Sequence, residues 1–117
     1  MKVLFSGSRD WDDVDAVRHW FHVLSLGPED TVIDGAARGL DSIAYRLACE
    51  YGCGRVRFPA LWAKDGRAAG PMRNQRMLDI AQPEIVLAFP LPKSVGTIHM
   101  MRIAVNAGIG LIDCAAP

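Results

Sequence analysis

The sequence has few cysteines, no excess charge of either sign and no long apolar run. Its three cysteines, Cys49, Cys53 and Cys114, form no CxxC pair, so they favour small buried residues in a reducing compartment over a zinc site. No apolar stretch approaches the length of a membrane span, and residues 1–5 are too short for a secretory signal. We therefore expect a soluble, cytoplasmic protein with no membrane partner.

The charges balance, with 13 basic and 13 acidic side chains in 117 residues. General nucleic-acid binding rests on excess positive charge, so nucleic acid is not the expected partner, although a local basic site is compatible with this balance. Half of the residues are hydrophobic, and no repeat or low-complexity segment interrupts them. This composition predicts one globular domain over residues 1–117, with a core that needs no disulfide or metal.

Short apolar runs alternate with helical patterns along the chain. The patterns predict strands at residues 2–5, 31–34, 55–58, 84–89 and 110–113, and helices at 12–25, 40–51, 72–81 and from 97 onward. This alternation predicts an α/β fold, namely a Rossmann-like, doubly wound, five-stranded parallel sheet in the order 3-2-1-4-5 with helices on both faces. Residues 59–71 are expected to form a long loop.

Ligands of such sheets bind beyond the carboxyl ends of the strands. The segments expected there are rich in glycine, hydroxyl and basic residues, and they comprise residues 6–9, 35–39, 59–74 and 92–97. Four of the ten arginines lie in these segments, namely Arg9, Arg38, Arg67 and Arg73. We therefore expect a single cleft at the carboxyl edge of the sheet.

The turn from Asp34 to Asp41 joins a predicted strand to a predicted helix through Gly35 and Gly39. Glycine lets the backbone bend tightly, the helix start offers unpaired N–H groups, and Arg38 adds donors suited to phosphate, so the turn predicts an anionic, phosphorylated ligand. The turn is not GxGxxG, and the acidic residue of an NAD site is missing, which argues against a dehydrogenase. Asp41 either caps the helix or bonds a ribose hydroxyl.

Two further segments offer phosphate sites. Residues 6–9, with the sequence Ser-Gly-Ser-Arg, form either a simple turn or an anion-binding nest, and Arg9 favours ligand contact. Thr97 starts the last predicted helix, where it can act as the cap, and its hydroxyl and the nearby N–H groups can hold a phosphate. Lys93 and Ser94 lie close to it in the chain.

The segment 59–74 supplies the remaining candidates. Trp62 either stacks on a base or pins the loop to the body of the protein. Asn74 lines up with Met77 on the inner face of its helix, and a polar residue there indicates ligand binding or a backbone-locking role. Arg73, its neighbour, is expected to bind a ribose or a phosphate.

Taken in order, these motifs resemble a known family. The segments SGSRDW from Ser6, GAARGLD from Gly35, GPMRN from Gly70 and GT at Gly96 are similar to motifs of the YspA/YpsA-related branch of the SLOG superfamily. That superfamily joins the Smf/DprA proteins with the LOG phosphoribohydrolases. The resemblance spans nearly the whole chain and implies a Rossmann-like sheet that binds nucleotides or nucleotide-derived ligands.

The resemblance also bears on catalysis. LOG enzymes cleave nucleoside monophosphates with a PGGxGTxxE motif and an arginine, and Arg73 is similar to that arginine, but Met100 stands where the catalytic glutamate should be. N-glycosidic cleavage needs a group that stabilises an oxocarbenium-like transition state and activates water, and methionine does neither. Non-enzymatic binding is therefore favoured. Arg73, with Asp41 or Asp10, is a catalytic candidate only if the protein is an enzyme.

Three functions follow in order of preference. The first is a sensor or carrier for a nucleotide-like small molecule, such as an ADP-ribose-like phosphorylated ligand. The second is a LOG-like N-glycosidase, and the third is a DprA-like DNA-binding accessory protein, against which the neutral charge argues. The Met-rich last helix either makes a homodimer or forms a core stripe, and neither a cofactor nor a metal is expected. The candidate ligand-binding residues are Ser6, Gly7, Ser8, Arg9, Gly35, Ala36, Arg38, Gly39, Asp41, Trp62, Arg73, Asn74, Ser94, Gly96 and Thr97.

Overall fold

Five parallel strands form one sheet at the centre of the protein. The computed structural model describes residues 1–115, and its strands are β1 (Lys2–Gly7), β2 (Thr31–Asp34), β3 (Gly54–Arg57), β4 (Ile85–Phe89) and β5 (Gly110–Asp113). They pair in the order β3-β2-β1-β4-β5, and every pairing is parallel. The Rossmann-like α/β fold and the strand order predicted from the sequence are thus confirmed.

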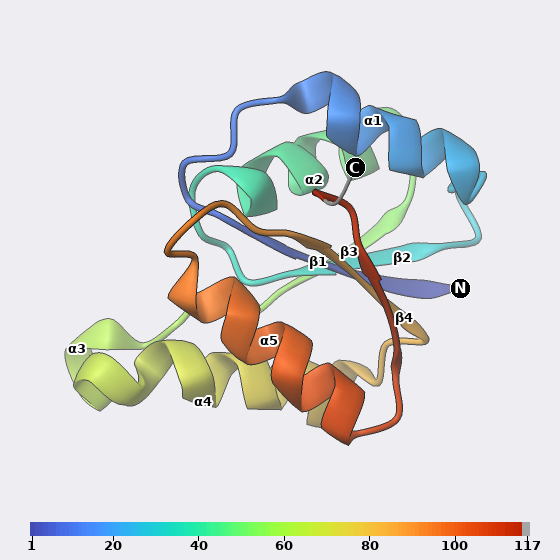
Figure 1. The fold of residues 1–117 in the computed structure, drawn as a ribbon. Helices are drawn as coiled ribbons and strands as arrows, with labels where there is room; N and C mark the ends of the chain where they lie inside the picture. Colours follow the sequence, from blue (N-terminus) through green and yellow to red (C-terminus); the bar gives the residue numbers. More distant parts are fainter. Residues whose placement is uncertain (116–117) are drawn as a thin grey trace.

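Helices cover both faces of this sheet (Figure 1). On one face lie α1 (Val14–Val23) and α2 (Leu40–Glu50), and on the other α3 (Trp62–Asp65), α4 (Ala69–Arg76) and α5 (Val95–Asn106). A 3-10 turn, η1 (Gly66–Ala68), joins α3 to α4, and a π-helical turn, η2 (Met77–Ala81), continues α4. Within residues 1–115, no helix is both long enough and apolar enough to cross a membrane.

The pleat of the strands divides the core into two layers. On β1, Val3 and Phe5 belong to the layer under α1 and α2, whereas Leu4 belongs to the layer under α4 and α5, because successive side chains alternate between the faces. All three are fully buried, and burial of such a side chain stabilises the fold by about 1.5–3 kcal/mol. Met77 and Met100 close the second layer, so Met100 is a core residue.

The segment predicted to be a long loop contains helical structure. Both α3 and η1 lie within residues 59–71, and α4 begins at Ala69. Pro71 fits the first turn of α4, because an N–H group there would have no partner within the helix. Gly66 and Gly70 weaken the helical pattern in the sequence, and the burial of Ala69 and Gly70 overrides that local preference.

The last helix also differs from the prediction at its start. It begins at Val95, and Ser94 occupies the N-cap position, so the prediction that Thr97 caps this helix is wrong. Within the predicted stripe, Thr97, Met100 and Ala104 are buried, whereas Val105 is 61% exposed. Packing in the core accounts for the inner part of the stripe, and the homodimer stays a prediction.

Replacing Phe89 with alanine should lower the free energy of unfolding by about 3–5 kcal/mol. Its ring is fully buried, and its centre lies 6.1 Å from that of Phe5 and 5.3 Å from that of Trp11, so truncation leaves a cavity under α1. Urea denaturation followed by circular dichroism measures the loss. The control is Val105→Ala on the exposed side of α5, and equal losses in the two variants would contradict this account of the core.

Candidate functional site

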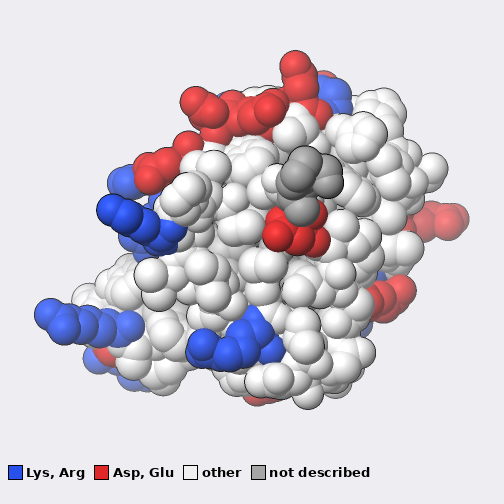
Figure 2. Space-filling model, viewed as in Figure 1, with Lys and Arg blue, Asp and Glu red and all other residues white. Residues whose placement is uncertain are grey.

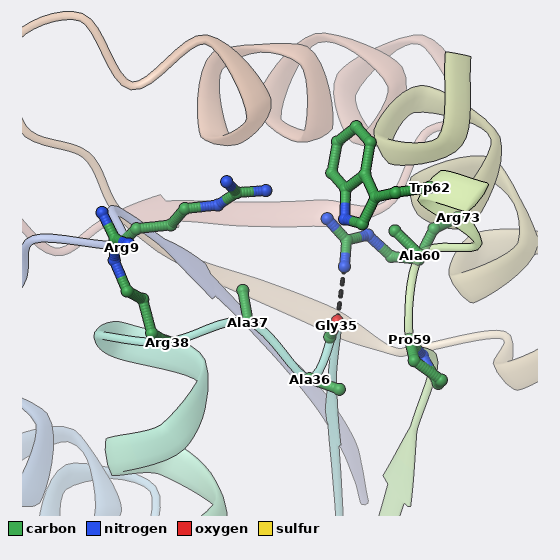
Figure 3. Close-up of a pocket in the computed structure, with 9 residues that line it drawn as sticks. All are labelled: Arg9, Gly35, Ala36, Ala37, Arg38, Pro59, Ala60, Trp62 and Arg73. Atoms are coloured by element: carbon green, nitrogen blue, oxygen red, sulfur yellow. Dashed lines mark hydrogen bonds between the residues drawn. The ribbon is translucent and has the colours of Figure 1, made fainter. Parts of the chain in front are cut away.

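The carboxyl ends of the strands open into a cleft with two lobes. The large lobe, of about 880 Å³, lies between the loops after β1 and β4 and the helices α4 and α5. The small lobe, of about 300 Å³, lies between the turn after β2 and the segment from Pro59 to Trp62 (Figure 3). The lobes share Arg9, Ala37, Arg38, Trp62 and Arg73, so they form one continuous site.

The structure brings almost all of the predicted ligand-binding residues to this cleft. Gly35 and Ala36 line the small lobe only, and Gly39 lines neither lobe. The others line the large lobe, and they are Ser6, Gly7, Ser8, Arg9, Arg38, Asp41, Trp62, Arg73, Asn74, Ser94, Gly96 and Thr97. A site of this volume fits a small-molecule ligand.

Gly39 holds two of the loops together. It has a φ of +71°, a conformation that favours glycine, and a Cβ there would collide with the backbone carbonyl of Arg9. The neighbouring Leu40 N–H donates to the carbonyl of Ser8 at 3.1 Å. The absence of a side chain at Gly39 therefore lets the turn after β2 pack directly on the loop after β1.

The turn after β2 is closed by two buried carboxylates. The Asp41 carboxylate accepts from the N–H groups of Gly35 at 3.1 Å and Ala37 at 3.3 Å, and the Asp34 carboxylate accepts from Ala36 N–H at 2.7 Å. These three amides are therefore already engaged and do not face the cleft as free donors. Gly39, not Asp41, occupies the N-cap position of α2, so the prediction that Asp41 caps the helix is wrong.

The pKa values of Asp34 and Asp41 are both raised, because both carboxyl groups are buried. Burial, and secondly the charge of Asp34, raises the pKa of Asp41 from its ordinary value of 3.8 to about 7. Burial also raises the pKa of Asp34, although Ala36 N–H and Arg57 oppose the rise. Arg57 Nε lies 2.9 Å from Asp34 Oδ1, and its guanidinium lies 4.1 Å from the ring centre of Tyr45. A cation that packs on an aromatic ring therefore holds Asp34 from outside the cleft.

A chain of hydrogen bonds starts at Arg73, which is only 9% exposed. Its guanidinium donates to the carbonyl of Gly35 (Figure 3) and, through Nε at 2.9 Å, to Asn74 Oδ1. The Asn74 amide in turn donates to the carbonyl of Gly96 at 3.1 Å and to His99 Nδ1 at 3.1 Å. This chain links the turn after β2, the first turns of α4 and the start of α5, so Asn74 has the backbone-locking contacts that its position suggested.

The part of the large lobe around Ser6, Gly96 and Thr97, which we call its floor, carries polar groups without hydrogen-bond partners among the described residues. The side chains of Ser6 and Thr97 line the lobe and are 8% and 4% exposed, and in the described part of the chain neither hydroxyl makes a hydrogen bond. The N–H groups of Gly96 and Thr97, in the first turn of α5, likewise have no acceptor among residues 1–115. Donors at a helix start that have no acceptor in the protein are suited to an anionic ligand.

The cleft is basic although the chain is neutral. Six Arg or Lys side chains line the large lobe against two Asp side chains, and the six are Arg9, Arg38, Arg67, Arg73, Lys93 and Arg102. Figure 2 shows basic side chains at the left flank and across the lower part of the molecule, whereas acidic side chains gather over α1 at the top. This separation of charge gives the cleft a local attraction for anions.

Trp62 lies at the boundary of the two lobes. Its side chain is 48% exposed, and the guanidinium of Arg9 lies 5.3 Å from the ring centre. Gly70 packs beneath the ring, because a Cβ at Gly70 would lie 3.2 Å from the Trp62 ring. The ring is thus held at the lobe boundary but remains accessible, so both predicted roles of Trp62 fit this position.

The prediction from the sequence did not include two cleft residues of α5. His99 and Arg102 line the large lobe together with Val95 and Ile98, and the spacing of three or four residues along the helix is the signal that could have found them. Burial, together with the charge of Arg102, lowers the pKa of His99. Because the Asn74 amide donates to Nδ1, the neutral ring of His99 carries its proton on Nε2.

The fold and the cleft define a class, namely Rossmann-like α/β proteins with a basic ligand site at the carboxyl edge of the sheet. A family model described as the YspA, cpYpsA-related SLOG family matches residues 1–64, and the chain belongs to that family. The chain is similar to the Gene 61 protein of Mycobacterium phage D29, with 41% identity over 123 residues that cover 96% of this chain and 94% of that protein. No solved structure matches the chain. Membership of the SLOG family suggests nucleotide-related binding.

Replacing Gly39 with alanine should lower the free energy of unfolding of the protein more than the same change at Gly108. Both glycines have a φ above +70°, but a Cβ at Gly39 meets the Arg9 backbone, whereas one at Gly108 meets open space. Gly108→Ala should lower the free energy of unfolding by roughly 1–2 kcal/mol through backbone strain alone, and Gly39→Ala should lose about 1–3 kcal/mol more through the collision. Urea denaturation of both variants checks this, and equal losses would contradict the contact.

The titration of Asp41 should make the folded protein less stable as the pH rises from about 4 to about 7. Because the pKa of Asp41 is raised to about 7 in the folded state, the folded protein keeps a proton in this window that the unfolded chain has lost. The free energy of unfolding therefore falls by up to about 1.4 kcal/mol per pH unit. Asp41→Asn removes this proton, so the free energy of unfolding of the variant minus that of the native chain should rise with pH across the window.

Urea denaturation at several pH values measures this difference. The matched control is Asp10→Asn, because the side chain of Asp10 is 80% exposed and its replacement leaves the buried Asp41 carboxyl in place, so the fall in stability from about pH 4 to about pH 7 should persist. A flat difference for Asp41→Asn would show that its carboxyl group titrates normally.

Proposed function

We propose that the protein binds a phosphorylated nucleotide in the large lobe and acts as a sensor or carrier rather than as an enzyme. The observation that supports this most strongly is the set of unpaired donors at the floor, formed by the hydroxyls of Ser6 and Thr97 and the N–H groups of Gly96 and Thr97. Several N–H and O–H donors that converge at a helix start suit the oxygens of a phosphate.

The charges around the floor support the same ligand. Lys93, just before α5, and Arg102, two turns into it, line the lobe, and each cation within a few ångströms of a phosphate strengthens its binding in a partly desolvated cleft. Six of the 13 basic side chains line the large lobe, although the net charge of the chain is zero. A compact anion therefore fits better than a long polyanion, which needs an extended basic surface.

The rest of the nucleotide would extend from the floor toward Trp62. A base would stack on the half-exposed indole in place of the Arg9 guanidinium, which lies 5.3 Å from the ring centre, and stacking of a base on an aromatic side chain contributes about 1–3 kcal/mol. His99 also lines the lobe, and its Nε2–H, which has no acceptor among residues 1–115, would donate to a ribose hydroxyl or a phosphate. The predicted roles of Arg9, Arg38 and Arg73 as phosphate or ribose ligands belong to the same proposal.

The candidate catalytic groups favour binding over hydrolysis. Met100, at the position of the catalytic glutamate in LOG-like enzymes, is fully buried in the core and bears no acid. Of the two carboxylates that line the cleft, Asp41 is engaged with the turn and Asp10 is 80% exposed. Hydrolysis of the N-glycosidic bond, with Arg73 as a catalytic residue, is the alternative that the following experiment separates.

Incubation with a panel of nucleoside monophosphates, nucleoside diphosphates and ADP-ribose tests the proposal. We expect the melting temperature to rise with at least one of these compounds, by mass action on the folded state, while no free base appears in the same samples. Release of base would overturn the non-enzymatic assignment in favour of a LOG-like enzyme, and no stabilisation by any compound would overturn both. Salt-sensitive retardation of single-stranded DNA would instead favour a DNA-binding protein.

Thr97→Val should weaken binding of the stabilising nucleotide roughly 10- to 100-fold, because it removes one hydrogen bond to a charged group and keeps the side-chain shape. Isothermal titration calorimetry measures the change in Kd. The matched control is Thr31→Val at the opposite, amino end of β2, outside both lobes of the cleft. An unchanged Kd in Thr97→Val would rule out a phosphate at the floor.

A further inference from the structure

The side-chain amide of Asn74 is held in one orientation by two partners that can each bond in only one way. Arg73 Nε, which only donates, lies 2.9 Å from Asn74 Oδ1, and the Gly96 carbonyl, which only accepts, lies 3.1 Å from Asn74 Nδ2. A flipped amide would lose both hydrogen bonds. Because Asn74 is only 3% exposed, and a buried polar group without a partner costs about 1–3 kcal/mol, the flipped orientation is strongly disfavoured.

This orientation determines which nitrogen of His99 carries the proton. Asn74 Nδ2 also lies 3.1 Å from His99 Nδ1, and since an amide nitrogen only donates, Nδ1 is the acceptor. The neutral ring then has its hydrogen on Nε2, whereas an imidazolium would place two N–H groups against each other. Burial and the charge of Arg102 also lower the pKa of His99, so the contacts and the surroundings both favour the neutral ring.

The hydrogen bonds from Arg73 to His99 therefore run in one direction. Arg73 donates to Asn74, and Asn74 donates to His99. His99 is left to donate through Nε2–H, which has no acceptor among residues 1–115. The ring lines the large lobe and lies beside the carbonyl of Gly96 at the floor, because both accept from the same Asn74 nitrogen. A free histidine can donate or accept at Nε2, and this arrangement removes that choice.

We propose that His99 is a specificity-determining residue of the cleft, held as a permanent donor by Arg73 and Asn74, and that it selects ligands with an acceptor oxygen at this place. The inference rests on the proposed function, because the acceptor belongs to the nucleotide in the large lobe. A phosphoryl oxygen and a ribose hydroxyl share this chemistry. Since Nε2 has no lone pair, His99 cannot take a proton as a general base there. Arg73 and Asn74 act in this respect as positioning residues.

Nitrogen-15 NMR of the native chain tests the state of the ring without any ligand. Long-range proton–nitrogen spectra distinguish a protonated ring nitrogen from an unprotonated one. The chain has three histidines, so the signals of His99 are identified by their loss in His99→Gln. Between about pH 6.5 and about pH 8, we expect a proton on Nε2 and none on Nδ1. A proton on Nδ1, or a mixture of the two forms, would overturn the inference.

Asn74→Asp should reverse the direction of these hydrogen bonds. A carboxylate accepts from Arg73 and also from His99, so the neutral ring of the variant carries its proton on Nδ1 and presents a lone pair to the ligand. The carboxylate also raises the pKa of the ring, and the imidazolium that forms at lower pH donates through Nε2 again. The variant therefore regains the donor as the pH falls, whereas the native chain has it throughout.

Calorimetric titration with adenosine 5′-monophosphate, with the guanosine, cytidine and uridine compounds run in parallel, measures this reversal. The ratio of the Kd of Asn74→Asp to the native Kd should be roughly tenfold larger at about pH 8 than at about pH 6. The ratio cancels the titration of the phosphate and of Asp41, which both proteins share, while Arg73 on α4 and Arg102 on α5 keep their charge. Asn106→Asp, at an exposed position of α5 outside both lobes, is the matched control and should show a constant ratio.

Two replacements of His99 itself test the donor even if Asn74→Asp does not fold. His99→Gln keeps an N–H donor and should retain the native Kd within about threefold, whereas His99→Phe keeps a ring without a donor and should weaken binding roughly tenfold. His19→Gln, an exposed histidine of α1 outside both lobes, is the control. Equal losses for the two His99 variants would show a role in packing only and would contradict selection by a donor.

The same variants identify the source of the acceptor. A loss in His99→Phe that persists with inorganic phosphate assigns a phosphoryl oxygen, and a loss with the ribonucleotide that disappears with its 2′-deoxy or 3′-deoxy form assigns a ribose hydroxyl. If the monophosphates bind but the ratio for Asn74→Asp does not change with pH, the inference is wrong and the proposed function stands. If no nucleotide binds the native chain, the proposed function is wrong, and selection by His99 falls with it.

Discussion

The buried guanidinium of Arg73 is the contact on which the site depends. A cation almost fully removed from water is stable only where donors and acceptors match it, and Arg73 satisfies this by donating to the Gly35 carbonyl and to Asn74. The Asn74 amide in turn donates hydrogen bonds to the Gly96 carbonyl and to His99 Nδ1. Three segments that follow different strands must therefore keep one relative arrangement, and that arrangement is the cleft.

The carboxylates behind the turn determine which backbone donors remain open. Asp34 and Asp41 engage the amides of the turn after β2, whereas the first turn of α5 keeps free N–H groups beside the unpaired hydroxyl of Thr97. An anion therefore meets backbone donors at α5 and side-chain cations at the turn. This division makes the two ends of the cleft chemically different.

The composition of the whole chain and the composition of the cleft carry different information. Balanced charges argue against a general polyanion binder, yet the sheet gathers six cations and only two acidic side chains around one cleft. The core adds a second constraint, because Met100 lies in the apolar layer with Met77 and offers nothing to a reaction. Membership of the SLOG family agrees with nucleotide-related binding, and Met100 belongs to the core of this chain.

By itself, the sequence determined the α/β class, the strand order and the loops that form the cleft, because apolar periodicity and turn residues act over a few neighbouring positions. It could not reveal the short helix at Trp62–Asp65, none of whose residues is buried, nor that Asp41 turns back to bond Gly35. It also missed His99 and Arg102, since their place in the lobe depends on the rotation of α5. Those features were decided only by the tertiary structure, because burial and hydrogen bonding between distant segments select one partner among several that local sequence leaves open.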